Sequence, residues 1–476
     1  MGGTDEERRT RLKPVMARST AHKPSSRAVA DLATERLAAY AAAAKFEHFP
    51  QMAVERAKRC LIDAVACAIF GAQFPWSTMV LDEALATGAG GPCRVPGVPG
   101  KALHVPQAAL VAGAFAHAFE YDNLRKPGAG VHAGATVALP ALAMAQAVNG
   151  SGKELIAAII AGVEVMFRIG AATLHTPEHI GFHAPGMTGP FGSAAACASL
   201  MGLSARQTAH AFGIAGSLAG GLLAFAKAGS GGMVKRLHLG RAAESGVLAA
   251  RLASRGYEGP RNVIEGRYGV LEAFCEENDP ILLTQGLGQV FEIERVCFKR
   301  YPCHVTAHVP VQLLRNLMTT GRFGGEDIQA IAIEASGKVV SHHNERAPAD
   351  VMLAQYSVPF CVAIAAFHDP LDPAVFTDDV VRDPRVRALA NAIKVSASDT
   401  VKGWGARLDI TLKDGRTFGG QIDTWLGCPE TPLSTEQLRD KFDRITGSAS
   451  TLLRETLFDN LMQLEQVKSL EPLALT

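Results

Sequence analysis

The sequence predicts a mainly α-helical protein in which a large all-helical domain, built from both ends of the chain, is interrupted by a smaller α+β domain. Three observations support this. A chain of 476 residues exceeds the roughly 250 to 300 residues at which a single core usually divides. Alanine and glycine are abundant and only 6% of residues are aromatic, which favours closely packed helices. The pattern changes near residue 290, where alternating, β-branched stretches begin.

Residues 1–29 are predicted to be a disordered lead-in. They are polar and contain no apolar h-region, so they do not resemble a secretory signal, and we expect a cytoplasmic protein. Residues 30–290 form the first part of the helical domain, with helical patterns in 28–46, 51–72, 105–121, 135–150, 152–173 and 241–257. Ser204 and Gln207 have the spacing of a capping box. The most apolar of these segments fall short of the ~20 uninterrupted apolar residues of a membrane span, so we interpret them as core helices.

Residues 291–432 form the predicted α+β domain. Strands are predicted in 290–299 and 327–336, and a hairpin in 406–423 turns at Asp414-Gly415. Helices are expected at 305–318 and 351–367. In residues 433–476, Ser434 and Gln437 open amphipathic helices that return to the first domain.

Charge and cysteine usage exclude several classes of protein. The formal net charge of +1 lacks the electrostatic footprint of a nucleic-acid binder. The nine cysteines contain no CxxC pair, which argues against a zinc ribbon or an ordinary iron–sulfur cluster. We therefore expect reduced, buried cysteines and no resident metal or cofactor.

Four segments concentrate His, Lys, Gly and Pro in Ala- and Leu-rich surroundings: "EYDNLRKPGAGVHAGAT", "HIGFHAPGMTGPFGSAAA", "GSGGMVKRLHLGRAAESG" and "FKRYPCHVTAH". In the first, Gly130 and Gly134 flank His132 before a helix, where an anion could bind. In the second, His183 precedes small residues that let a ligand approach the backbone. Each segment has a simpler interpretation as a turn between helices, and each histidine as a hydrogen-bonded core residue.

In the third segment, Lys235, Arg236 and His238 suit a substrate rich in carboxylates. The pattern is not a P-loop, because the GxxxxGK[ST] spacing is missing. The alternative is a solvated basic helix end.

In the fourth segment, His304 and His308 are four residues apart, and we favour an acid–base histidine over zinc because no HExxH glutamate lies between them. Tyr356, in "QYSVPF", is either catalytic or a packing residue. A group of other histidines lacks such a neighbourhood and is interpreted as structural or exposed: His117, His175, His179, His342 and His343.

At these segments the sequence resembles the MmgE/PrpD family, which includes 2-methylcitrate dehydratase, cis-aconitate decarboxylase and iminodisuccinate epimerase. The marks are "HAFEYDN" followed by "VHAGA", then "GFHAPGMTGPFGSAAA", "KRLHLGRAAESGVLAA", "FKRYPCHVTAH" and "QYSVPF", in this order. The resemblance implies that the α+β domain is a lid, that the protein is a homodimer, and that the site lies between the two domains. It implies a set of catalytic residues: His132, His183, Lys235, His304 and Tyr356. Asp122 belongs to the acidic motif upstream, and Arg236 and His238 adjoin the lysine.

The chain departs from the family pattern in the first segment. It has "EYDNL" where dehydratases and decarboxylases tend to have "DFDDT", and "HAG" replaces "HPG" at 132–134. One carboxylate and one hydroxyl are thereby lost, and Arg125 and Lys126 are expected to add cations.

These observations predict a cofactor-independent lyase for a small di- or tricarboxylate. Reactions of this family make a carbanion-like centre beside a carboxylate; Lys235 and Arg236 would offset its charge and a histidine would move the proton. We place dehydration of a citrate-like hydroxyacid ahead of decarboxylation. The alternatives are epimerisation of an amino or imino dicarboxylate and a non-catalytic carboxylate-binding protein.

Overall fold

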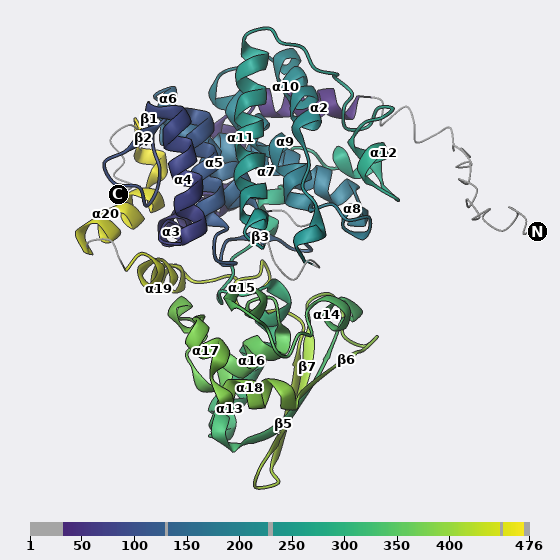
Figure 1. The fold of residues 1–476 in the computed structure, drawn as a ribbon. Coiled ribbons are helices and arrows are strands. Elements are labelled where there is room, and N and C mark those ends of the chain that lie inside the picture. Colours follow the sequence, from purple (N-terminus) through teal and green to yellow (C-terminus); the bar gives the residue numbers. More distant parts are fainter. Residues whose placement is uncertain (1–31, 129–131, 227–231, 448–450, 471–476) are drawn as a thin grey trace, which may run out of the picture.

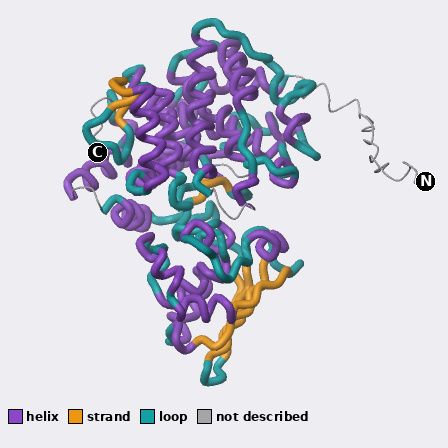
Figure 2. Tube along the Cα trace, viewed as in Figure 1, coloured by secondary structure: helices purple, strands orange, loops and turns teal. Residues whose placement is uncertain are grey.

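The computed structural model describes residues 32–128, 132–226, 232–447 and 451–470, and the predicted lead-in lies outside this range. The protein is mainly helical with a small sheet region, as the sequence predicts. Figure 1 shows a broad helical body and, below it, a tapering part that contains the sheet. In Figure 2 most of the strand residues gather along one side of that tapering part.

The helical body has α11 at its centre. Helix α11 (Val234–Ser254) packs most extensively on α9 (Ala184–Leu200) and α5 (Val105–Ala116). The other long helices surround these three: α2 (Ala33–Ala42), α3 (Gln51–Gly71), α4 (Pro75–Gly88), α6 (Leu139–Ala147), α7 (Gly152–Ala172) and α10 (Ala205–Leu218). The shorter helices are α8 (Thr176–His179) and α12 (Val270–Phe274). The predicted capping box of Ser204 and Gln207 is confirmed at the start of α10.

The tapering part contains a four-stranded sheet in the order β6-β5-β7-β8. Its strands are β5 (Ile328–Ala335), β6 (Ile393–Ala397), β7 (Ala406–Leu412) and β8 (Thr417–Ile422). Strands β5 and β6 are parallel, whereas β7 pairs antiparallel with both β5 and β8. The hairpin predicted at Asp414-Gly415 is confirmed, and Gly415 has the positive φ of 86° that favours glycine there.

One helix precedes β5, and the other helices of this part lie between β5 and β6. In chain order these helices are α13 (His308–Gly321), α14 (Gly337–His342), α15 (Val351–Ala354), α16 (Val358–Phe367), α17 (Asp378–Arg382) and α18 (Pro384–Ala392). The helix expected at 305–318 begins as a 3-10 turn, and the helix expected at 351–367 is broken into α15 and α16. Ser357 caps α16 by accepting a hydrogen bond from the Phe360 N–H, so a new helix begins after it. Tyr356 therefore lies at the break between α15 and α16.

The strand predicted at 290–299 is largely wrong. Residues Glu292–Arg295 form a 3-10 turn, and only the two residues of β4 (Val296–Cys297) pair with β3 (Leu124–Arg125). The Glu292 N–H donates to the Glu164 carboxylate (2.8 Å) rather than to a neighbouring strand, so the alternating pattern serves a turn that is packed on the helical core. A second short pair joins β1 (Ala89–Arg94) and β2 (Ala102–Leu103).

The C-terminal helices pack on the helical body. Helix α19 (Thr435–Ile445) begins at the predicted capping box of Ser434 and Gln437, and both α19 and α20 (Thr451–Met462) contact α3. Their apolar residues Leu438, Phe442 and Leu461 belong to the same core as Leu61. All nine cysteines are buried and free, which agrees with the prediction.

Helix α7 is more apolar than the sequence analysis expects. By length and composition its 21 residues could cross a membrane, yet 94% of its most apolar stretch is buried against the rest of the protein. Such burial is typical of a core helix.

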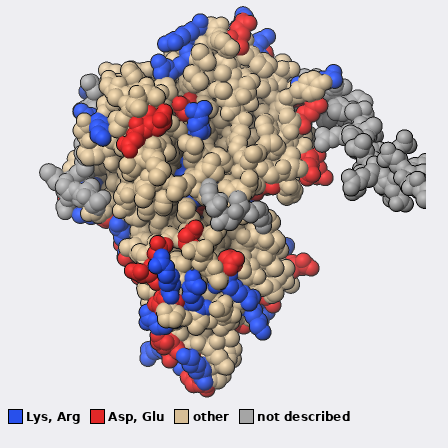
Figure 3. Space-filling model, viewed as in Figure 1, with Lys and Arg blue, Asp and Glu red and all other residues tan. Residues whose placement is uncertain are grey.

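On the face shown in Figure 3, charges of both signs interleave rather than forming a basic stripe.

Gly246 should be essential for the close contact of α11 with α9. A Cβ atom there would lie 2.3 Å from the Ser193 Cβ and 2.5 Å from the Pro190 carbonyl oxygen. We predict that Gly246→Ala lowers the free energy of unfolding by about 1 to 3 kcal/mol, as overpacking usually does. Gly337→Ala is the control, because nothing lies within 4 Å of that Cβ position, and it should change stability by less than about 0.5 kcal/mol. Equal urea midpoints for the two variants would contradict the prediction.

Candidate active site

The loop after α5 supplies the acidic groups of the site. His117 ends α5, and Glu120 has a positive φ of 56°, which is unusual for a residue other than glycine. This conformation turns the chain so that Glu120 and Asp122 both lie in the interior, at 1% and 0% exposure. Two carboxylates this far from water require partners.

Glu120 lies between two buried lysines. Its carboxylate pairs with Lys235, in the first turn of α11, and lies 3.3 Å from Lys299 Nζ, which also donates to the Glu120 backbone oxygen (2.9 Å). Burial alone would raise the pKa of the Glu120 carboxyl, but Lys235 and Lys299 hold it well below its usual value. Burial lowers the pKa of Lys235 to about 8, against the opposing effect of Glu120. Glu120 thus keeps a buried ammonium protonated near neutral pH.

Asp122 is held by two histidines. His117 Nδ1 lies 2.9 Å from Oδ1, and His132 Nδ1 lies 2.9 Å from Oδ2. Burial would raise the pKa of Asp122, yet His132 and His117 keep it well below its usual value. Burial lowers the pKa of His117 to about 3, so this ring is neutral and its other nitrogen, Nε2, lies 3.6 Å from Glu120. His117 therefore hydrogen-bonds Asp122 and lies near Glu120 without bonding it.

His117, Asp122 and His132 also form the group best suited to a metal among the described residues. One donor atom from each lies within 4.8 Å of the others. His117 Nδ1 and Asp122 Oδ1, however, form a direct hydrogen bond (2.9 Å), and His132 Nδ1 hydrogen-bonds the Asn123 backbone oxygen (3.1 Å) while it lies 2.9 Å from Asp122 Oδ2. His117, Asp122 and His132 thus form a triad, in which Asp122 Oδ2 and His117 Nε2 have no hydrogen-bond partner among the described residues.

His183 and His238 form a second histidine pair. His183 ends the turn before α9, His238 lies in α11, and their Nδ1 atoms are 3.1 Å apart, so one ring donates to the other. Burial, followed by the charge of Lys235, lowers the pKa of His183 well below its usual value and lowers that of His238 as well. His238 follows Lys235 by three residues on α11, and Lys235 pairs with Glu120, so this histidine pair adjoins the Glu120 cluster.

The third group comes from the tapering part of the protein. The rings of His304 and His343 stack with centroids 4.0 Å apart, and the Tyr356 ring lies 4.9 Å from His304. Lys235 Nζ lies 4.5 Å from the centre of the Tyr356 ring, which joins this group to α11. Burial lowers the pKa of His304 well below its usual value and that of His343 to about 3, and it raises the pKa of Tyr356. At neutral pH the two histidines are therefore uncharged, whereas Tyr356 retains its proton.

Arg236 is the cation with free hydrogen-bonding capacity. Its Nη1 donates to the Gly232 carbonyl (3.0 Å), but its buried Nη2 has no partner among the described residues.

The cations expected from Arg125 and Lys126 do not reach the site, so that expectation is wrong. Arg125 pairs with Glu292 (2.8 Å) and Lys126 with Glu430 (3.1 Å), and both partners lie far along the sequence.

The structure brings together all eight residues singled out from the sequence: His132, His183, Lys235, His304, Tyr356, Asp122, Arg236 and His238. It adds Glu120, Lys299 and two histidines interpreted as structural, His117 and His343. Both histidines are buried rather than exposed and contact the cluster, and a structural role for them stays a prediction. Glu120 lies in the first and Lys299 in the fourth of the segments rich in His, Lys, Gly and Pro. Their place in these segments was a signal from which sequence reasoning could have found them. His308, in contrast, packs beside Tyr301 and Trp425.

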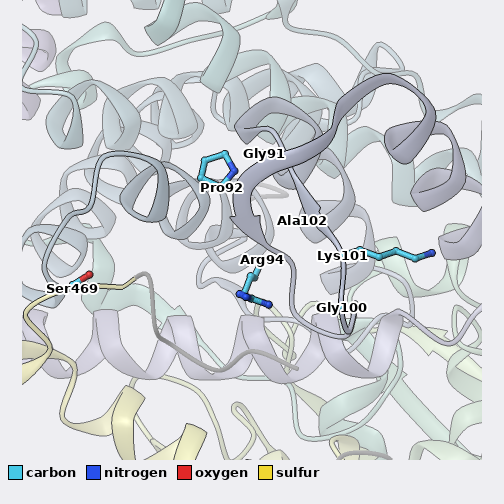
Figure 4. A pocket seen from close by; sticks show the side chains of 7 residues that line it. All are labelled: Gly91, Pro92, Arg94, Gly100, Lys101, Ala102 and Ser469. Carbon is cyan, nitrogen blue, oxygen red and sulfur yellow. The ribbon is translucent and has the colours of Figure 1, made fainter.

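A surface hollow of about 680 Å³ lies elsewhere, between β1, β2 and Ser469 (Figure 4). Its only charged lining groups are Arg94 and Lys101, and it shares no residue with the cluster. The acid–base groups of the described chain therefore point to the cluster, rather than this hollow, as the candidate active site.

Glu120 should be critical for stability. Glu120→Gln removes the counter-ion of two buried lysines, and we predict a loss of about 3 to 5 kcal/mol in the free energy of unfolding, as for a broken buried ion pair. The control is Glu430→Gln, because Glu430 is 59% exposed in its pair with Lys126. That exposed pair should contribute less than about 1 kcal/mol. Urea denaturation of both variants tests this, and a wild-type midpoint for Glu120→Gln would refute it.

Comparison with known proteins finds matches along most of the chain. The family model for the MmgE/PrpD N-terminal domain matches residues 35–282, and that for the MmgE/PrpD C-terminal domain matches residues 301–457. Cis-aconitate decarboxylase of Aspergillus terreus is 30% identical over 457 residues, covering 90% of this chain and 92% of its own. Cis-aconitate decarboxylase of Mus musculus is 27% identical over 458 residues, covering 92% and 91%. These relatives support a lyase-type role. The chain belongs to the MmgE/PrpD family.

Proposed function

We propose that this protein is a cofactor-independent lyase that removes carbon dioxide from a small unsaturated tricarboxylate such as cis-aconitate. The observation that carries the proposal is the buried ammonium of Lys235, held by Glu120 and covered by the Tyr356 ring. The relatives named cis-aconitate decarboxylases favour this reaction over the dehydration that the sequence alone places first.

The proposed step breaks the bond between a CH2 carbon and its carboxylate, next to a carbon–carbon double bond. The electron pair that is released moves through the allyl system to the far carbon, which carries another carboxylate. One proton added at that carbon gives the rearranged alkene and carbon dioxide. The reaction thus needs no base, but it needs cations for the developing charge and one proton donor.

The cluster contains both kinds of group. Lys235 and Arg236 would bind carboxylates and offset the developing negative charge, which is where preorganised charge contributes most to rate. Lys235, with a pKa of about 8, and Tyr356, with a raised pKa, hold protons at neutral pH and are the candidate donors. His132 would orient the substrate from the Asp122 side.

Dehydration remains a second candidate because of one specific observation. The lowered pKa values of His183 and His304 make them neutral at pH 7, so either ring could remove the proton that loss of water requires. A hydroxyacid substrate would then use Tyr356 as the donor to the leaving hydroxyl. Epimerisation would use the same groups without a leaving group.

The proposal includes a lid role for the tapering part and a homodimer. His304, His343 and Tyr356 come from that part, whereas the charged groups come from the helical body, so separating the two would open the site. Exposed apolar residues near the start of α11 support a subunit contact: Leu222, Met233 and Val234 are 59%, 44% and 42% exposed.

NMR in deuterated water tests the reaction. The metal-stripped protein is incubated with cis-aconitate, citrate, 2-methylcitrate and epimerisable aspartate-derived acids. We expect carbon dioxide and a singly deuterated alkene from cis-aconitate. Loss of water from a hydroxyacid would replace this proposal by a dehydratase, and deuterium exchange alone would replace it by an epimerase. Binding without any turnover would refute the lyase assignment.

The pH dependence of turnover should reveal Lys235. The pKa of Lys235 is lowered to about 8, so its ammonium is present below that pH and is lost as the pH rises through it. We predict that wild-type kcat falls above about pH 8. Lys235→Met should lower kcat by about 100-fold, as is typical for one acid–base or charge-stabilising group, and should abolish this limb.

Lys58→Met is the matched control. Lys58 is also a buried, ion-paired lysine, but its partners Glu55 and Glu465 lie outside the cluster. This variant should keep the wild-type kcat and the wild-type limb. Near-normal turnover in folded Lys235→Met would remove Lys235 from the catalytic groups.

A further inference from the structure

A second buried ion pair lies behind the acidic loop of the active site. Lys441, on α19, donates to Asp63 Oδ1 on α3 (2.5 Å) and to the Tyr121 backbone oxygen (2.8 Å). Both side chains of the pair are at most 5% exposed. We call Lys441, Asp63 and Asn123 the brace, because the other oxygen of Asp63 is bound by Asn123.

Asn123 connects the ion pair to the loop. Its backbone N–H and its Nδ2 both donate to Asp63 Oδ2, at 3.0 and 2.9 Å. Nδ2 also donates to the Cys60 carbonyl (3.2 Å). The side-chain nitrogen of Asn123 therefore donates to both Asp63 and Cys60, which requires the two N–H donors of an amide.

The remaining groups of Asn123 contact the triad of His117, Asp122 and His132 and the residue Gly134 beside it. Its Oδ1 accepts from the Gly134 N–H (2.9 Å), and its backbone oxygen lies 3.1 Å from His132 Nδ1. Asp122, the carboxylate between His117 and His132, is the adjacent residue. Asn123 thus follows Asp122 directly in the chain and hydrogen-bonds both His132 and Gly134.

We infer that Lys441 and Asp63 are positioning residues that act through Asn123 to set the places of Asp122 and His132. The inference rests on the proposed function for its kinetic consequence, but its structural part stands by itself. Helix α19, near the C-terminal end of the chain, would then support a site whose other residues lie between 117 and 356. We call α19 and the brace the frame of the site. A shift of about 1 Å in a catalytic group can cost on the order of 100-fold in rate, so the frame matters for turnover.

The experiment compares four variants of the full chain. Lys441→Met removes the charge that holds Asp63, and Asn123→Asp replaces the Nδ2 donor by an acceptor that faces Asp63. Lys441→Arg restores the charge, and a polar cavity of about 20 Å³ beside Lys441 and Arg300 gives the larger group some room. Lys58→Met is the control, because Lys58 likewise ties α3 to the C-terminal end, through Met462 and Glu465, without contacting the loop.

Two measurements are made below the unfolding temperature of every variant. The first is kcat, KM and the pH profile with the substrate established by the deuterium experiment. The second is the long-range ¹H–¹⁵N NMR spectrum of histidine rings, with His132 identified through His132→Gln. This spectrum reports the hydrogen bonding of the His132 ring whether or not any turnover is found.

We expect Lys441→Met and Asn123→Asp to lower kcat by about 30-fold with KM changed less than about threefold, since positioning rather than binding is lost. Both should shift the His132 ring signals, and Lys441→Arg should recover at least part of kcat. Lys58→Met should change neither. Wild-type His132 signals in both Lys441→Met and Asn123→Asp would overturn the inference, even if the proposed reaction is correct. Altered signals in a protein that turns over none of the acids would refute the proposed function and leave the positioning role intact.

Discussion

The Glu120 carboxylate is 1% exposed between the ammonium groups of Lys235 and Lys299, and its stability depends on both partners staying in place. An isolated charge in the interior costs several kcal/mol, so such a group persists only where the fold delivers its partners accurately. The three residues come from three separate elements: the loop after α5, the start of α11 and the segment after β4. The relative positions of these elements are therefore constrained by charge as well as by apolar packing.

Small residues make this arrangement geometrically accessible. Gly240 lies so close to α5 that a Cβ atom would be 2.4 Å from the Leu110 oxygen, and Gly246 lies equally close to α9. Helix α11 can therefore approach α5 and α9 at backbone distance. That approach places Lys235 beside the end of α5, where Glu120 lies, and places His238 beside His183 at the start of α9. The abundance of alanine and glycine in the sequence thus serves the site as well as the core.

How much of this could be predicted from the sequence depends on the range over which each feature is determined. Most of the long helices, the Asp414-Gly415 hairpin and the capping boxes at Ser204 and Ser434 follow from local pattern and were predicted, whereas helix α4 was not. The site segments were found because glycine and proline mark where helices start. The role of Glu120 was missed because Lys235 is 115 residues away, and Arg125 was misassigned because Glu292 is 167 residues away. The stacking of His343 on His304 was likewise not foreseen, because the two residues lie in separate segments of the sequence.

In the proposed lid arrangement, the division of the site between two parts of the chain would couple closure to proton affinity. The charges of Glu120, Lys235 and Lys299 are held in the helical body, whereas the His304–His343 stack and Tyr356, whose ring covers Lys235, come from the tapering part. Burial is the largest cause of the lowered pKa of Lys235. Moving Tyr356 away to admit a substrate would hydrate the ammonium and raise its pKa toward the ordinary value, whereas closing would lower it again. In the proposed lyase, closure over a substrate would thus make Lys235 a stronger acid at the moment when a carbanion-like centre needs a proton, and binding would be coupled to chemistry without any further group.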